Sequence, residues 1–449
     1  MVHQLGQKQQ STRRRVREAD RENELMDPNL TPAARAAGLD LAHALIESAA
    51  RRSVALFCKT DRYDWIWETP PTLVANLMLE CLPRFVRQAG GQIAGSLRFG
   101  PHGEVLTPTC QTVPVDGRLR PILREGHLFV HFPDRRIVIS SEESRFGDRL
   151  TLGVRADRQA TTFWEQWQAY GRSHNYLRGR SFFADGEVID RKQSYSWDNI
   201  LLPAELIRTI RTHVEGFLKH RDRLRALGVK ARRGLILSGP PGTGKTLVGK
   251  ILADTLDVSF MWVTPRHIEN AQSFADILTA ARFVAPAVVF LEDLDLFAEE
   301  REAGCWVGMG ELMNQLDGAA ENDGLVTIAT TNRLQVIEKA LRNRPGRFDR
   351  VLEFGPLDEA ARRRMVARLL EKADAATTEI EQLVAATKDY TGAQIEELVN
   401  TVYILAAERY TEDVAGDAPP RILVDPPLIA AAVDEFRVEM KARVGFRVA

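Results

Sequence analysis

The chain has 449 residues, enough for roughly two to four domains, and its 44% hydrophobic content is ordinary for a globular protein. Its formal net charge of −1 excludes an overall basic field of the kind that marks nucleic-acid binders. Its four cysteines are widely spaced without a Cys-x-x-Cys pair, which argues against a zinc site or a disulfide framework and favours a reducing cytoplasm.

The first half of the chain carries no catalytic motif. Residues 1–35 are polar and predict a disordered, solvated tail, and the start of this segment does not resemble a signal peptide. Residues 36–190 predict a small α+β module with helices near 38–50, 71–88 and 161–174. Between the last two helices, strands are predicted at 92–98, 127–132, 136–140 and 149–154. His127 and His131 share one strand face, but a metal site needs further ligands, so they predict packing or surface positions.

The second half of the chain has a different order of predicted strands and helices. Strands and helices alternate through residues 191–357, which predicts a parallel α/β sheet, and residues 358–449 are mostly helical. No apolar run is long enough to span a membrane.

A phosphate-binding loop follows the first apolar strand of this region and precedes an amphipathic helix, which is the context the motif requires. Its glycines let backbone N–H groups surround phosphates, and the helix dipole favours their charge. The residues predicted to bind the nucleotide are Gly239, Pro240, Pro241, Gly242, Thr243, Gly244, Lys245, Thr246 and Leu247. Lys245 is predicted to reach the β/γ-phosphates of ATP, and the Thr246 hydroxyl to ligate Mg²⁺.

Two further strands carry polar residues at their carboxyl ends, where ligands collect in such sheets. The strand 288–291 ends in Glu292-Asp293, a Walker B element in which Glu292 is predicted to hold Mg²⁺ and Asp293 to orient the attacking water. The strand 325–330 leads to Asn332, whose amide can hydrogen-bond the γ-phosphate or that water. Three arginines then fall within residues 344–350, and an arginine can offset charge on a transferring phosphoryl group.

These motifs, in this order, resemble the AAA family of ATPases over about residues 197–409. The resemblance implies that Asn332 is sensor 1 and that Arg347 and Arg350 are arginine fingers, which act across subunits of a ring of six or seven. Residues 390–395 resemble the sensor 2 turn of the branch in which an alanine, here Ala393, replaces the sensor arginine.

The sequence departs from the usual AAA motifs at two places, which indicate the branch of the family that it resembles. The usual Walker B order is Asp-Glu, and the swapped Glu292-Asp293 resembles the mitochondrial translocase of the folded Rieske protein. That translocase has a membrane anchor, which this chain lacks, so the sequence looks like a soluble bacterial relative. The segment 263–273 lacks the aromatic-apolar-Gly triplet of threading AAA proteins, and Trp262 before it is expected to pack in its strand.

The leading hypothesis is a ring-forming ATPase in the cytoplasm that remodels or moves an unidentified protein partner, read by the module at 36–190. The alternative is a motor or loader acting on a nucleic-acid-bound complex, for which the charge gives little support. A nucleotide-gated scaffold with slow turnover is a third reading, and the complete set of motifs argues against it.

Overall fold

The structure is a computed structural model divided into two compact units, Met1–Gly171 and Arg172–Ala449. It describes residues 52–60, 62, 64–100, 104–143, 150–156, 158–190, 193–229, 232–296, 324–335, 337, 348–409 and 422–445. The tail predicted for residues 1–35 and the helix predicted at 38–50 lie outside these ranges. None of the helices in the described ranges is both long and apolar enough to cross a membrane.

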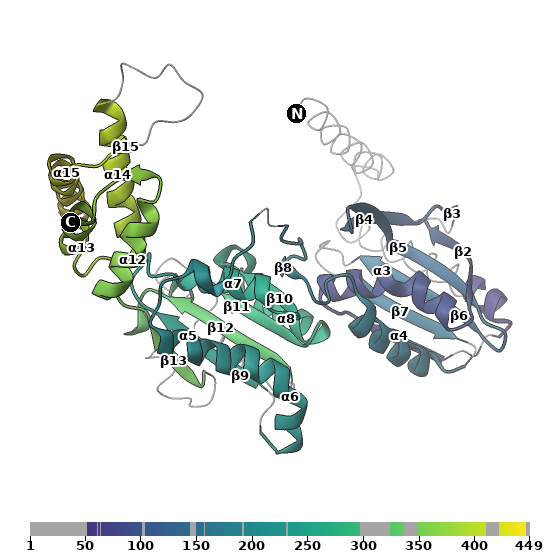
Figure 1. Cartoon of the computed structure of the whole chain (residues 1–449). Coiled ribbons are helices and arrows are strands. Elements are labelled where there is room, and N and C mark those ends of the chain that lie inside the picture. The colour runs from purple at the N-terminus through teal and green to yellow at the C-terminus, as the bar shows by residue number, and fades with distance from the viewer. Residues whose placement is uncertain are drawn as a thin grey trace. The chain divides into compact units, whose positions relative to one another are not determined.

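The first unit contains an antiparallel sheet with strand order β1-β7-β6-β5-β2-β3, in which β4 also pairs with β5 (Figure 1). Its strands are β1 (Asp64–Glu68), β2 (Gln92–Phe99), β3 (Val105–Leu106), β4 (Thr109–Val115), β5 (Arg118–His131), β6 (Arg136–Glu143) and β7 (Leu150–Ala156). Its helices include α3 (Thr72–Gln88) and α4 (Ala160–His174), and residues 52–58 are also helical. The helices predicted at 71–88 and 161–174 and the four predicted strands are therefore confirmed.

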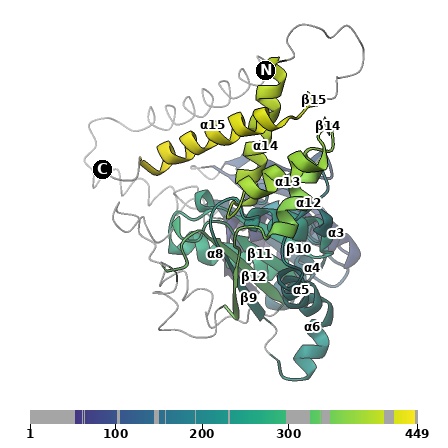
Figure 2. The same ribbon diagram turned by 60° about the vertical axis from the view of Figure 1, so that its left-hand side comes forward.

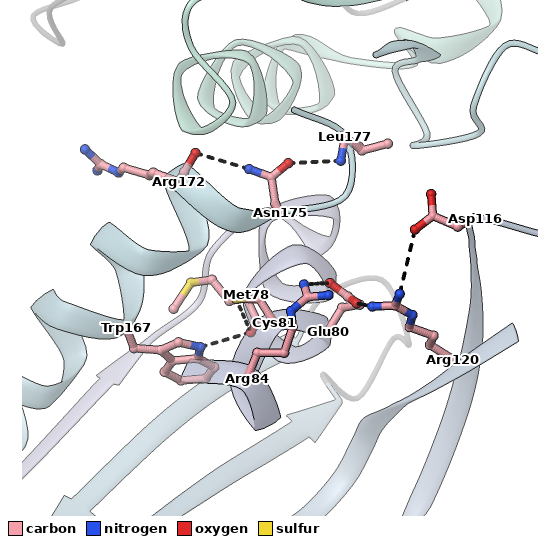
Figure 3. Close-up of polar contacts among 10 residues, drawn as sticks. All are labelled: Met78, Glu80, Cys81, Arg84, Asp116, Arg120, Trp167, Arg172, Asn175 and Leu177. Carbon is pink, nitrogen blue, oxygen red and sulfur yellow. Dashed lines mark hydrogen bonds and ion pairs between the residues drawn. The ribbon is translucent and has the colours of Figure 1, made fainter. Parts of the chain in front are cut away.

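Helices α3 and α4 pack against each other through aromatic side chains. The ring centroids of Phe85 and Phe163 are 5.3 Å apart. The Trp167 indole donates a hydrogen bond of 2.9 Å to the carbonyl of Met78 (Figure 3). Trp167 has no exposed surface, so this bond satisfies an N–H group that would otherwise be costly to bury.

A buried carboxylate joins α3 to the sheet. The side chain of Glu80 is only 1% exposed, and it accepts bonds from Arg84 at 2.8 Å and Arg120 at 2.5 Å (Figure 3). A buried charge is tolerated when it is paired and hydrogen-bonded in this way. Arg84 lies one turn further along α3, whereas Arg120 lies on β5, so the pairing connects the helix to that strand.

The second unit contains a six-stranded parallel sheet with strand order β13-β9-β12-β11-β10-β8 (Figure 1). Its strands are β8 (Ser181–Phe183), β9 (Arg232–Ser238), β10 (Ser259–Val263), β11 (Ala287–Leu291), β12 (Leu325–Thr331) and β13 (Arg350–Glu353). The helices along it are α5 (Ala204–Arg211), α6 (Phe217–Ala226), α7 (Lys245–Thr255) and α8 (Ala271–Phe283). Strands β9 to β12 are almost wholly buried, which is typical of parallel sheets covered on both faces. The predicted fold class is confirmed.

One predicted boundary needs correction. The sequence placed the end of the first module at residue 190, but the structure assigns everything from Arg172 to the second unit. The reason is β8, which pairs in parallel with β10 and forms the edge of the second sheet. A strand of three residues has too little periodicity to be recognised in a sequence.

A helical lid completes the second unit (Figure 2). It contains α12 (Glu359–Leu369), α13 (Thr377–Ala386), α14 (Gly392–Arg409) and α15 (Pro426–Gly445), with the short strands β14 (Ala373–Asp374) and β15 (Ile422–Leu423). Asp358 caps the first of these helices by accepting a hydrogen bond of 2.7 Å from the Ala361 N–H. The lid has its own apolar core, separate from the core beneath the parallel sheet.

Candidate active site

The phosphate-binding loop connects β9 to α7, as the sequence predicts. Gly239 has a φ of 156°, and a Cβ at this position would lie 2.0 Å from the carbonyl oxygen of Phe354, so only glycine fits. Gly244 caps α7 in the left-handed conformation, with a φ of 97°. The two glycines therefore set the path of the loop and leave its N–H groups at the start of a helix, where anions bind.

Lys245 is held inside this loop. Its Nζ donates to the carbonyls of Gly239 and Pro240, at 2.6 and 2.8 Å, and to Oδ1 of Asn332 at 2.9 Å. Burial lowers the pKa of Lys245, while the carboxylates of Asp293 and Asp295 act in the opposite direction. A partly desolvated ammonium at this place is suited to binding phosphate oxygens, because electrostatic interactions strengthen as water is excluded.

The Walker B glutamate lies opposite the start of α7. Oε1 of Glu292 accepts a hydrogen bond of 2.8 Å from the Thr246 hydroxyl, and Oε2 accepts one of 3.0 Å from the Trp262 indole. Trp262 packs in its strand, as expected, and is 6% exposed. A hydroxyl and a carboxylate side by side are hard oxygen donors of the type Mg²⁺ prefers, so the pair fits the predicted metal site.

Asp293 has a separate position. Its backbone has a φ of 51°, a left-handed conformation that aspartate tolerates, and its N–H donates to the Thr330 hydroxyl at 2.9 Å. Its carboxylate lies 3.4 Å from Nδ2 of Asn332 and lines the pocket above the loop. Burial, with Glu292 and Asp295 nearby, raises the pKa of Asp293, and Lys245 and Asn332 oppose the increase.

The two adjacent acids therefore occupy different places. Glu292 bonds to Thr246, whereas Asp293 bonds to Asn332. The assignment of Glu292 to the metal and of Asp293 to the attacking water stays a prediction. A raised pKa makes the Asp293 carboxylate a better proton acceptor than an ordinary aspartate.

One acidic residue was not assigned a role from the sequence. Asp295 is 2% exposed, accepts a hydrogen bond of 3.2 Å from the Asn332 N–H, and pairs with Arg333 Nε at 3.5 Å. It therefore holds the backbone at Asn332. The sequence does contain a signal for Asp295, which lies two residues after Asp293 in the turn that follows β11. This turn brings the Asp295 side chain next to the end of β12.

The pocket has a volume of about 680 Å³ and combines the loop with the lid. Of the predicted nucleotide-binding residues, Pro241 to Leu247 line it, and Gly239 and Pro240 act through their carbonyls on Lys245. The wall also includes Asp293, Asn332, and Gly392 and Ala393 of the predicted sensor 2 turn. Its other residues were not predicted from the sequence: Tyr195, Asn199, Ile200, Leu201, Lys250, Leu357, Met365, Arg368 and Glu396.

The lid touches the loop directly at Ala393. Its N–H donates to the carbonyl of Gly242 at 3.1 Å, and a Cβ placed on Gly242 would lie 2.6 Å from the Ala393 Cβ. Because the Ala393 side chain carries no charge, it contacts the loop only by van der Waals packing. A longer side chain at Gly242 or Ala393 would push the lid away from the loop.

Of the two predicted arginine fingers, Arg350 begins β13, is exposed, and is not among the described residues that line the pocket. Arg347 lies outside the described residues. The structure therefore brings together Lys245, Thr246, Glu292, Asp293 and Asn332, and leaves Arg350 apart from them.

Comparison with known proteins agrees with this geometry. Residues 235–356 match the family described as "ATPase family associated with various cellular activities (AAA)". This chain carries an AAA ATPase domain. ATP and Mg²⁺ are accordingly its cofactors, and the loop, Thr246 and Glu292 are the groups that fit them.

The AAA ATPase domain is also similar to curated proteins. The chain is 35% identical over 251 residues to "ATP-dependent zinc metalloprotease FTSH 1, chloroplastic" of Oryza sativa subsp. japonica, covering 51% of this chain and 36% of the relative. It is 33% identical over 249 residues to "ATP-dependent zinc metalloprotease FtsH 3" of Synechocystis sp., covering 51% and 40%. The chain thus spans under half the length of these relatives. Among solved structures, the FIGL-1 AAA domain in complex with ADP is 22% identical with a TM-score of 0.46, covering 58% of this chain and 93% of that one.

Proposed function

We propose that the protein is a ring-forming AAA ATPase of the cytoplasm that couples hydrolysis of Mg-ATP to the remodelling or movement of a protein partner. The observation that carries the proposal is the separation of Arg350 from the pocket that holds Lys245, Asp293 and Asn332. Because Arg350 does not line the pocket of its own chain, we infer that it acts at the site of a neighbouring subunit, as the family resemblance implies.

In this mechanism the chain's own groups divide the work. The loop N–H groups and Lys245 bind and orient the phosphates, and bound Mg²⁺ supplies charge neutralisation there. Asn332 contacts both Lys245 and Asp293, so it is placed to sense whether a phosphate lies between them. Asp293 accepts the proton of the attacking water, for which its raised pKa suits it.

The branch and the ring size belong to the proposal. The Glu292-Asp293 order supports kinship with the Rieske-protein translocase branch, and a ring of six or seven subunits follows from the family resemblance. The curated relatives carry protease names, and their overlap with this chain is confined to about half of it. Proteolysis is therefore not part of the function we propose.

Subunit mixing tests the ring. Arg350→Ala and Arg347→Ala subunits should each be inactive alone and regain part of the activity when mixed with Lys245→Ala subunits, because the defects lie on opposite sides of an interface. Exposed Arg364 on α12 provides a matched control, since Arg364→Ala should stay active alone. Full activity of the arginine variants as isolated subunits would contradict the proposal.

We assign partner choice to the first unit, none of whose described residues lines the nucleotide pocket. Of its aromatic residues, Trp65 is 65% exposed on the edge strand β1, whereas Phe129, Phe132, Trp164 and Trp167 are buried. Exposed tryptophans are frequent anchors of interfaces.

A truncation tests this assignment. A chain starting at Arg172 keeps β8 and should retain nucleotide binding while losing the partner found by cross-linking the full chain. Starting near residue 193 instead would remove a strand of the ATPase sheet. Equal capture of the same partner by the truncated and full chains would place recognition in the second unit.

A further inference from the structure

The Walker B carboxylate is held at both oxygens by the protein itself. Oε1 of Glu292 accepts from Thr246 at 2.8 Å, and Oε2 accepts from the Trp262 indole at 3.0 Å. Thr246 comes from the first turn of α7, and Trp262 from the neighbouring strand β10. The carboxylate is thus fixed between a helix and a strand.

The strand register explains how Trp262 reaches the glutamate. In the parallel pair, Trp262 lies beside Phe290, and their ring centroids are 4.6 Å apart at an angle of 47°. Glu292 follows Phe290 by two residues, so its side chain leaves β11 on the same face, and its N–H donates to the Val263 carbonyl at 2.9 Å. The indole is long enough to extend along this face to the carboxylate, whereas a smaller side chain would end at Phe290.

A glutamate at this position needs such a contact more than an aspartate does. Its carboxylate has one further rotatable bond from the backbone, so it loses more rotamer freedom when it is fixed beside a metal. Groups that orient metal ligands through hydrogen bonds typically change metal affinity when they are removed.

We propose that Trp262 is a positioning residue that holds Glu292 in the orientation needed to bind Mg²⁺ at the nucleotide. The indole N–H carries this role, and the ring additionally packs against Phe260 and Phe290. The proposal rests on the nucleotide site alone, so it stands or falls independently of ring formation and of the protein partner.

The test measures nucleotide binding in the full chain, with a fluorescent ATP analogue, first in EDTA and then during a Mg²⁺ titration. Trp262→Phe keeps an aromatic ring in the strand but lacks the N–H. We expect unchanged affinity in EDTA, and a rise of about tenfold or more in the Mg²⁺ concentration that gives half of the metal-dependent gain in affinity. An unchanged Mg²⁺ dependence would overturn the proposal.

A matched control distinguishes the loss of the hydrogen bond between Trp262 and Glu292 from the general effect of removing an indole N–H. Trp197 donates to Oε1 of Glu215 at 2.9 Å in the same unit, and neither residue lines the nucleotide pocket. Trp197→Phe therefore removes an equivalent indole–carboxylate bond and should leave the Mg²⁺ dependence as it is in the unaltered chain.

The glutamate offers a second, independent measurement, which also applies if Trp262→Phe does not fold. Glu292→Asp restores the acid usual at the first Walker B position but shortens the side chain by one methylene, so it cannot keep the bonds to both Thr246 and Trp262. We expect weaker Mg²⁺ binding than with Glu292. Mg²⁺ binding as tight as, or tighter than, that of the unaltered chain would show that the hydrogen bonds from Thr246 and Trp262 to Glu292 are not needed. In the double variant, Trp262→Phe should add no further loss, and a fully additive loss would mean that Trp262 acts elsewhere.

Discussion

The close contact between the lid and the phosphate-binding loop allows the effect of a substitution at Gly242 to be predicted. This residue has a φ of 78°, and an added Cβ would lie 2.6 Å from the Ala393 Cβ and 3.1 Å from the Thr391 hydroxyl. Carbon atoms in contact are normally about 3.5–4.0 Å apart, so Gly242→Ala must move the start of α14 away from the loop by about 1 Å.

Two costs combine in this variant, and a control separates them. A left-handed alanine costs roughly 1–2 kcal/mol wherever it occurs, and overpacking adds about 1–3 kcal/mol. Gly179 in the same unit has a φ of 71° with nothing within 4 Å of the added Cβ, so Gly179→Ala carries the first cost alone. The difference between the two variants measures how firmly the lid is seated on the loop.

The assay combines thermal unfolding with nucleotide affinity. Gly242→Ala should lower the stability of the second unit by about 1–3 kcal/mol more than Gly179→Ala does, and it alone should weaken nucleotide binding, because the lid forms one wall of the pocket. Ala393→Gly in the same chain should restore part of the nucleotide affinity by removing the opposing methyl group. Equal effects of the two alanine variants on both measurements would refute this account of the contact.

Other predictions concern single ionisable groups. Lys245→Ala should weaken ATP binding by about tenfold or more, measured by titration, because a charged hydrogen bond contributes about 1.5–3 kcal/mol. Asp293→Asn should lower the hydrolysis rate about 10²–10⁴-fold while ATP still binds, and normal turnover in this variant with loss in Glu292→Gln would reverse the two roles. Burial lowers the pKa of His127 to about 4, below its usual value of 6.5. The unfolded chain therefore takes up this proton first, so stability present above pH 6.5 falls by up to about 3 kcal/mol towards pH 4, and denaturant unfolding of His127→Gln should show a smaller fall.

The sequence was most informative where function depends on neighbours along the chain. Strand β9, the loop and α7 follow one another directly, and the ends of β11 and β12 were recognisable from apolar runs that stop at Glu292 and Asn332. The carboxyl ends of parallel strands meet at one edge of a sheet, so these groups could be expected to converge.

Contacts between distant segments were not predictable in the same way. The wall formed by Met365, Arg368 and Glu396 comes from lid helices whose docking depends on tertiary packing, and the sequence offers no local signal for it. The bond from Trp262 to Glu292 depends on the register of two strands. The sequence pattern predicted that Trp262 is buried, but it did not predict the hydrogen-bond partner of the indole.

The arrangement around Asn332 suggests how nucleotide state reaches the rest of the unit. Its side chain contacts Lys245 and Asp293, and its backbone N–H donates to Asp295, so these contacts link Lys245 to the end of β12. The loop that carries Lys245 also contacts the lid, because the Gly242 carbonyl accepts a hydrogen bond from the Ala393 N–H. The phosphate-binding loop therefore contacts both Asn332 and the lid, so a phosphate bound at Lys245 would act on groups on both sides of the pocket. This coupling is the physical requirement for an ATPase that performs work, because binding energy can shift an equilibrium only through groups that differ between the two states.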